Sequence, residues 1–133
     1  MERTAFINNG IFFCIKGSEF INIFVKDGPP EKISKELKEK SRLTKKDWRK
    51  YIDNTWRFPP EKDRRHPAPF PLELPYRLIK LFSFADDIIV DPFMGSGTTA
   101  FAAKKARRNY IGYELNQNYI DMANERLAQT ELF

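Results

Sequence analysis

The pattern of apolar and polar positions is clearest in the second half of the chain. A short apolar run at 86–91, DDIIVD, precedes an alanine-rich stretch at 97–107, GTTAFAAKKAR. The same order then recurs with NYIGYEL at 109–115 and NQNYIDMANERLAQ at 116–129. Short β-branched runs that alternate with helical patterns predict a strand–helix–strand–helix unit with parallel strands and a right-handed crossover. Helices cover both faces of such a sheet, and ligands bind beyond the carboxyl ends of its strands.

Three further helical patterns precede this unit. LELPYRLIKLFSF at 72–84 is amphipathic. Its predicted apolar face consists of Leu74, Leu78, Leu81 and Phe82. LTKKDWRKYI at 43–52 has Thr44 as a candidate cap, and Asp47 three residues later completes a loose capping box. EKISKELKEKSR at 31–42 has a helical composition but little apolar face.

The N-terminal part contains two short β-branched and aromatic runs, IFFCI at 11–15 and EFINIFV at 19–25, separated by KGS. This pattern predicts a β-hairpin. We therefore expect one α/β domain with a β-hairpin over 1–26, a basic helical segment over 27–65 and a Rossmann-like βαβα unit over 66–133.

Composition narrows the class of protein. The 133 residues suffice for one domain with a modest core. No apolar stretch approaches the roughly 20 residues of a membrane helix, and MERTAFINNG at the start lacks the apolar run of a signal peptide. The single cysteine, Cys14, has no internal disulfide partner and is expected to be a small buried hydrophobe. We expect a reducing, cytoplasmic setting and no membrane partner.

The net charge of +5 is concentrated in one segment. Residues 31–65 contain thirteen Lys and Arg against seven Asp and Glu, whereas the rest of the chain is almost balanced. A local excess of cations is the footprint expected of a protein that binds a phosphate backbone. A solvated, charged helix face is the alternative interpretation.

The glycine-rich turn in IIVDPFMGSGTTAFAA, at 88–103, predicts a ligand site with several candidate ligands. A phosphate-binding P-loop requires a lysine that GSGTT lacks. GSGTTA satisfies the dinucleotide pattern G-x-G-x-x-G/A, with Glu114 as the following acid. Only 19 residues follow Glu114, which leaves no room for the second half of a dinucleotide fold. A tight turn without a ligand is a further alternative.

S-adenosylmethionine suits these residues better, because its adenosine carries no phosphates. Gly95 and Gly97 let the backbone approach the methionine part of the ligand. Glu114, at the end of the second strand, can accept hydrogen bonds from both ribose hydroxyls. Asp91 can organise the turn and reach the ammonium group. Backbone donors at the start of the following helix would also face the ligand: Thr98 and Thr99.

DPFMGSGTT at 91–99 resembles the cofactor-binding motif of the DNA amino-methyltransferases, which methylate an exocyclic amine of adenine or cytosine. HPAPFPLELPYRLIKLFS at 66–83 is similar to the segment before this motif in the beta-ordered branch of the family. LTKKDWRKYIDNTWRFPPE at 43–61 resembles the lead-in, and RRNYIGYELNQNYIDMANERL at 107–127 resembles the strand and helix that follow. The resemblance implies a cofactor pocket formed by His66, Pro67, Ala68, Phe70, Pro71, Asp91, Pro92, Phe93, Gly95, Gly97, Thr98, Thr99, Glu114 and Asn116.

The family's catalytic tetrapeptide, [D/N/S]-P-P-[Y/F/W], is not found in this chain. Its first side chain and a backbone carbonyl accept the hydrogens of the amine, and its aromatic ring stacks on the flipped base. The Pro-Pro pairs here, GPPE at 28–31 and FPPE at 58–61, have neither side chain. We therefore expect no catalytic residue and interpret the chain as a C-terminal half: one polypeptide of a split enzyme, an excised fragment or a truncated gene. The strands that flank 86–91 on the catalytic side should be missing, which would leave an unpaired edge.

The sequence thus predicts a partial methyltransferase domain that binds S-adenosylmethionine and double-stranded DNA. The expected DNA contacts are Lys45, Lys46, Arg49 and Lys50. The catalytic half would come from another chain or a missing segment, and the exposed sheet edge could mediate self-association. A non-enzymatic cofactor- or DNA-binding remnant and a dinucleotide-binding module are the alternatives, and no metal site is predicted.

Overall fold

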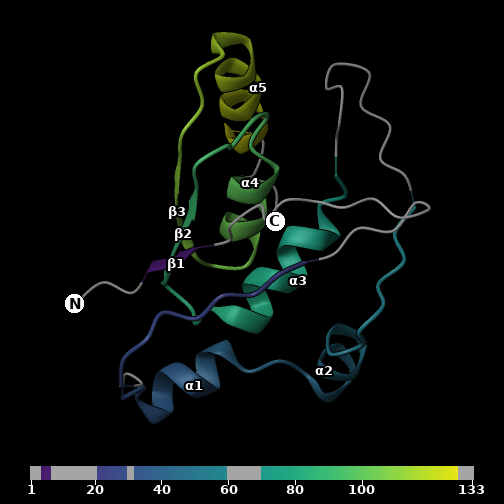
Figure 1. Cartoon of the computed structure of the whole chain (residues 1–133), viewed down its shortest axis with the longest axis vertical. Coiled ribbons are helices and arrows are strands. Elements are labelled where there is room, and N and C mark those ends of the chain that lie inside the picture. Colours follow the sequence, from purple (N-terminus) through teal and green to yellow (C-terminus); the bar gives the residue numbers. More distant parts are fainter. Residues whose placement is uncertain (1–3, 7–20, 30–31, 60–69, 129–133) are drawn as a thin grey trace.

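The computed structural model describes residues 4–6, 21–29, 32–59 and 70–128. The elements follow the order of the chain in Figure 1: β1 (Thr4–Phe6), α1 (Lys35–Ser41), α2 (Lys45–Tyr51), α3 (Glu73–Phe82), β2 (Ile88–Asp91), α4 (Thr98–Lys105), β3 (Asn109–Gly112) and α5 (Gln117–Ala128). Within these ranges, no helix has the length and apolar character needed to cross a membrane.

The three strands form one parallel sheet in the order β1-β2-β3. Ile89 pairs with Tyr110, and Val90 pairs with Ile111. The connection from β2 to β3 runs through α4, and α5 follows β3, so the predicted βαβα order is present. The carboxyl ends of β2 and β3 lie at the same edge of the sheet, because the two strands are parallel.

Two predictions about the N-terminal part are wrong within the described residues. Residues 21–26 form no strand, and their side chains are exposed, with Val25 85% accessible. A strand needs a partner for its backbone groups, and no segment within the described ranges pairs with residues 21–26. The other predicted strand, 11–15, lies outside the described residues, as does Cys14. The second error concerns the edge of β2, which is paired: Ala5 of β1 lies opposite Ile89.

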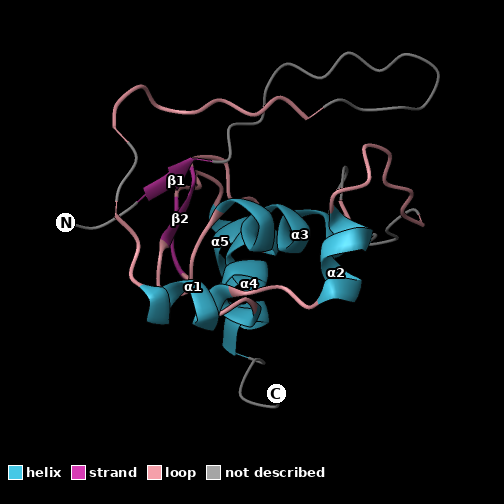
Figure 2. Ribbon diagram, turned by 90° about the horizontal axis from the view of Figure 1, so that it is seen from below, coloured by secondary structure: helices cyan, strands magenta, loops and turns pink. Residues whose placement is uncertain are grey.

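The helices on the sheet lie on one face only. Figures 1 and 2 both show α3, α4 and α5 on the same side of the strands. The core on that side consists of Ile79, Ile89, Ala102, Ala103 and Ala106. The alanines of α4 let this helix approach β2 closely. Successive side chains of a strand point to opposite faces, so Val90 and Ile111 face away from Ile89.

No helix of the described residues covers this second face, although both faces of a doubly wound sheet are expected to be covered. Ile111 is 43% exposed, and Tyr113, just beyond β3, is 62% exposed. We call Val90, Ile111 and Tyr113 the bare face of the sheet. Its apolar character is unusual for a surface in contact with water.

The buried face of α3 agrees with the predicted one only in part. Leu78 and Ile79 are buried, whereas Phe82 is 51% exposed. The buried set also contains an arginine, Arg77. Helical spacing alone does not predict that Arg77 is buried, because the helix packs against α4 on one side and against residues 51–58 on the other.

The two short N-terminal helices begin at side-chain caps. Ser34 accepts a hydrogen bond from the backbone N–H of Leu37 at 3.1 Å, and α1 starts at the next residue. Thr44 accepts from the N–H of Asp47 at 3.0 Å and donates to the Asp47 carboxylate at 2.7 Å. The predicted cap at Thr44 is therefore confirmed. Each cap satisfies a backbone donor that a helix terminus leaves unpaired.

Arg77 joins the basic segment to the rest of the fold. Its side chain is only 9% exposed and donates to Glu73 at 2.9 Å. Lys50 of α2 donates to the same carboxylate oxygen at 2.8 Å. Burial alone would raise the pKa of Glu73, but the hydrogen bonds from Lys50 and Arg77 outweigh it and the pKa is lowered.

The same guanidinium lies over three aromatic rings. Its carbon is 5.5 Å from the ring centre of Tyr51, 5.3 Å from that of Trp56 and 4.9 Å from that of Phe58. Trp56 and Phe58 also meet edge to face, with centres 6.1 Å apart. Arg77 thus holds α2 and the segment after it against α3.

Candidate cofactor site

The glycine turn lies between β2 and α4 and is hydrogen-bonded to the segment after β3. The N–H of Tyr113 donates to the carbonyl of Asp91 at 3.0 Å, and the N–H of Met94 donates to the carbonyl of Tyr113 at 2.9 Å. Gly95 and Gly97 have φ angles of +51° and +80°. These left-handed conformations favour glycine, and they turn the chain sharply from the strand into the helix.

Glu114 closes this turn from the neighbouring strand. One oxygen of its carboxylate accepts the N–H of Gly95 at 2.9 Å. The other oxygen accepts the N–H groups of Leu115 and Asn116 at 2.9 and 2.8 Å. The predicted juxtaposition of Glu114 with the glycine turn is therefore present. A negative charge is thereby fixed at the carboxyl edge of the sheet, where ligands of α/β folds bind.

Asp91 organises the start of the turn, as its position at the end of β2 suggested. Its Oδ1 accepts the N–H of Phe93 at 3.0 Å. Pro92 and Phe93 follow on the outside, and the Phe93 ring is 74% exposed. The edge of the sheet therefore carries two carboxylates and an accessible aromatic ring.

Gly97 also has a packing role, which its sequence position did not suggest. A Cβ atom at this residue would lie 2.8 Å from the Cβ and 3.2 Å from the Cα of Ala123 in α5. The absence of a side chain thus lets α4 and α5 approach each other, in addition to permitting the positive φ. A bulky residue here would press on the protein itself, so such a variant is a poor probe of ligand contact.

Met94 and Gly112 belong to the same turn and were not predicted. A Cβ at Gly112, the last residue of β3, would overlap the side chain of Met94 in the turn after β2. The only signal in the sequence is a glycine within an otherwise β-branched and aromatic run, which marks a close approach of other atoms.

The side chains at the helix starts point mainly to protein partners. Thr98 accepts from Arg126 of α5 at 2.6 Å. Thr99 is buried, with 6% of its surface exposed. Asn116 accepts the N–H of Asn118 at 3.0 Å and so begins α5. Any contact from Thr98 or Thr99 to a ligand at the turn would therefore come from the backbone rather than from the hydroxyls.

The predicted histidine-proline part of the pocket lies outside the described residues. This concerns His66, Pro67 and Ala68. Phe70, the next member of the set, is described and is 38% exposed, one residue before the half-buried Pro71.

The four cations predicted to bind DNA all lie on α2, where they have different surroundings. Lys50 is engaged with Glu73 at 2.8 Å and fixes α2 to α3. Lys45 and Arg49, one helical turn apart, line the same groove, whereas Lys46 lies outside it. The helical geometry separates residues that are adjacent in the sequence.

A parallel βαβα unit with a glycine turn closed by an acid that follows the next strand is typical of α/β domains whose ligands contain a nucleoside. The family comparison is more specific. The chain matches the family model for DNA methylases of the N6/N4 type over residues 3–125. The chain belongs to this family, and the resemblance found in the sequence is confirmed.

Individual relatives agree with this assignment. The chain is 33% identical over 144 residues to Type II methyltransferase M.MthZI of Methanothermobacter thermautotrophicus, and the match covers 97% of the chain. It is 36% identical over 138 residues, or 96% of the chain, to Type II methyltransferase M.MjaI of Methanocaldococcus jannaschii. The match covers 41% and 45% of these two proteins. The chain therefore spans less than half the length of either relative.

A solved structure shares the fold. TTHA0409 from Thermus thermophilus, assigned as a DNA modification methylase and complexed with S-adenosyl-L-methionine, is 41% identical with a TM-score of 0.71. The superposition covers 81% of this chain and 43% of that one.

Proposed function

We propose that this chain is the C-terminal part of a DNA amino-methyltransferase and that its glycine turn binds S-adenosyl-L-methionine. The observation that carries the proposal is the carboxylate of Glu114, held 2.9 Å from the N–H of Gly95 at the carboxyl edge of the sheet. The cofactor complex of TTHA0409, at 41% identity, supports it.

The functional groups at the turn fit this cofactor. The carboxylate of Glu114 can accept hydrogen bonds from the ribose hydroxyls. These hydroxyls would compete for the carboxylate with the backbone N–H groups that now donate to it. The carboxylate of Asp91 suits the ammonium group. The exposed ring of Phe93 and that of Phe70 offer apolar surface to the rest of the ligand. His66 and its neighbours remain part of the proposed pocket.

When bound, the cofactor supplies an electrophilic methyl group. The residues of this chain bind and orient that donor, and they bring it to the edge of the sheet where a base can approach. Methyl transfer also requires a group that accepts the hydrogens of the target amine and an aromatic ring that holds the flipped base. We propose that a second polypeptide segment supplies both groups.

The bare face of the sheet is where such a segment would pack. It presents Val90, Ile111 and Tyr113, of which the last two are 43% and 62% exposed. Apolar surface of this kind is stabilised when a partner covers it. Among the described residues no strand pairs with the outer edge of β3, so this edge can pair with the same partner or with a second copy of the chain.

Saturating S-adenosyl-L-methionine is expected to stabilise the folded chain, by about 2.7 kcal/mol at a hundredfold excess over Kd. Glu114→Gln should weaken binding about tenfold or more, because a hydrogen bond to a charged group is lost. Calorimetry and thermal unfolding measure both effects. Glu125→Gln, on the exposed side of α5, is the matched control and should bind normally.

The comparison ligand NAD separates this proposal from a dinucleotide-binding module. NAD should give no shift in melting temperature. A folded chain that NAD stabilises and S-adenosyl-L-methionine does not would contradict the proposal.

The chain alone is expected to transfer no methyl group to double-stranded DNA, whereas addition of the missing half should restore transfer. The physical reason is that GPPE and FPPE lack the side chains that would accept the amine's hydrogens and stack on the base. The measurement is incorporation of labelled methyl groups into DNA. Transfer by the chain alone would show that the catalytic residue lies within it, and no transfer by the reassembled halves would favour an inactive remnant.

A further inference from the structure

A groove of about 710 Å³ lies between α1, α2 and the end of α3, and the cofactor turn takes no part in it. Its walls come from three places in the chain: residues 38–43, residues 45–49 and residues 81–84. The last of these precede β2, so the groove lies toward the amino end of that strand, whereas the glycine turn follows its carboxyl end.

Arg108 fixes the wall formed by residues 81–84. This buried side chain donates to the carbonyl of Ser83 at 2.8 Å and to the Ser83 hydroxyl at 3.1 Å. On the opposite side, the hydroxyl of Ser41 accepts the N–H of Ala85 at 2.7 Å and so attaches α1 to the same segment. The groove therefore has walls held by buried hydrogen bonds.

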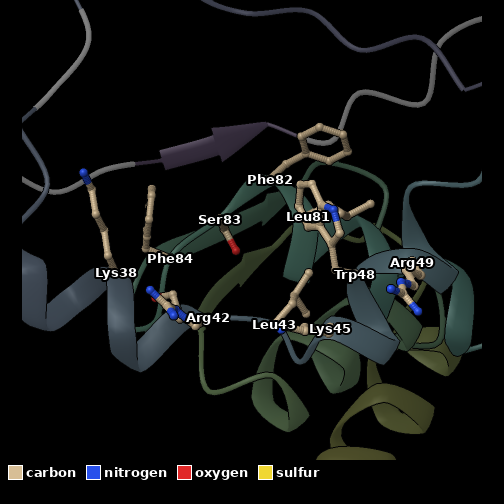
Figure 3. A pocket seen from close by; sticks show the side chains of 11 residues that line it. Lys38, Arg42, Leu43, Lys45, Trp48, Arg49, Leu81, Phe82, Ser83 and Phe84 are labelled. Carbon is tan, nitrogen blue, oxygen red and sulfur yellow. The ribbon is translucent and has the colours of Figure 1, made fainter.

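The described residues that line the groove include four cations and no carboxylate. The cations are Lys38, Arg42, Lys45 and Arg49. Figure 3 shows Lys38 and Arg42 toward one end of the groove and Arg49 toward the other. Arg42 also donates to Glu39 at 2.6 Å. Among the described residues, no carboxylate lies within ion-pair distance of Lys38, Lys45 or Arg49.

Two exposed aromatic rings lie between these cations. Trp48 is 52% exposed and Phe82 is 51% exposed. Both residues line the groove, and across the view of Figure 3 both appear between Arg42 and Arg49. Aromatic rings that remain accessible beside cations suit a ligand with flat apolar groups and a negatively charged chain.

We propose that this groove binds single-stranded nucleic acid. The cations would contact successive phosphates, and Trp48 and Phe82 would each stack on an unpaired base. In a duplex the faces of the bases are covered by neighbouring bases, so only the phosphates could contact the groove. The groove therefore favours an unpaired strand, and it acts apart from the edge of the sheet where the cofactor is proposed to bind.

The test measures binding of the 133-residue chain to fluorescein-labelled oligothymidylate and to a labelled duplex, by anisotropy at several salt concentrations. The groove variant carries Lys45→Gln and Arg49→Gln. The control variant carries Lys32→Gln and Lys35→Gln, which remove the same charge outside the groove, before and at the start of α1. Trp48→Ala tests stacking, and Trp48→Phe keeps a ring. Circular dichroism melting establishes that each variant is folded.

We expect the chain to bind oligothymidylate more tightly than duplex. The groove variant should lose about tenfold in affinity, and its slope of log K against log salt should fall by about 1.4, or about 0.7 for each lost phosphate contact. Trp48→Ala should lose about tenfold, with Trp48→Phe close to the original.

Three results would overturn the proposal. Equal losses in the groove and control variants would indicate a diffuse charge effect. Preference for duplex with no effect of Trp48→Ala would indicate contact with phosphates alone. Undisturbed oligonucleotide binding, together with sedimentation that changes in Trp48→Ala, would assign the groove to contacts between copies of the chain.

Discussion

Replacement of Gly97 by valine is expected to lower the free energy of unfolding by about 3 kcal/mol or more, the sum of a strained backbone and an overpacked contact. The φ angle of +80° is unfavourable for any β-branched side chain. The new Cβ would also meet the Cβ of Ala123 at 2.8 Å. Because domains are stable by only about 5–15 kcal/mol, the variant should melt at a much lower temperature, without any ligand present.

The two causes can be separated by a double-mutant cycle. Gly97→Ala in an Ala123→Gly background removes the shortest contact and leaves the strained φ, so the coupling energy should be favourable by about 1 kcal/mol. Gly28→Ala is the control for backbone strain alone, because nothing lies within 4 Å of its Cβ position. Additive effects at Gly97 and Ala123 would show that α5 moves away at no cost.

Arg77→Met is expected to destabilise the fold by about 2–4 kcal/mol, because it removes a buried guanidinium that pairs with Glu73 and lies over three rings. The ion pair between Lys50 and Glu73 would remain, which limits the loss of stability. The measurement is urea-induced unfolding followed by tryptophan fluorescence. Arg42→Met is the control: the side chains of its ion pair with Glu39 are 70% and 62% exposed, so its loss should cost less than about 1 kcal/mol.

The pH dependence of stability tests the same contact. The pKa of Glu73 is lowered in the folded chain from an ordinary value of 4.5, so its ion pairs stabilise the fold above that pH. This stabilisation is lost as the pH falls below 4.5 and through the folded-state pKa. The loss should be smaller in Arg77→Met, where one of the two donors is gone. If stability at acidic pH falls equally in Arg77→Met and in the original protein, Arg77 stabilises the fold through the aromatic rings alone.

Local sequence patterns are enough to predict several parts of this protein. The strand–helix–strand–helix order, the cap at Thr44 and the position of Glu114 at the end of the second strand all follow from short-range rules. A parallel βαβ connection then leaves few topologies, so the acid and the glycine turn had to meet at one edge. The order of the motifs also predicts the family correctly.

Other features depend on packing between segments that are distant in the sequence. Gly97 is close to Ala123, 26 positions away, and the sequence spacing contains no sign of that contact. Residues 21–26 have strand propensity but no partner, because pairing depends on distant segments rather than on local preference. Lys45, Lys50 and Arg77 look alike as surface cations. Packing of α2 against α3 assigns the first to an open groove, the second to an ion pair and the third to the interior.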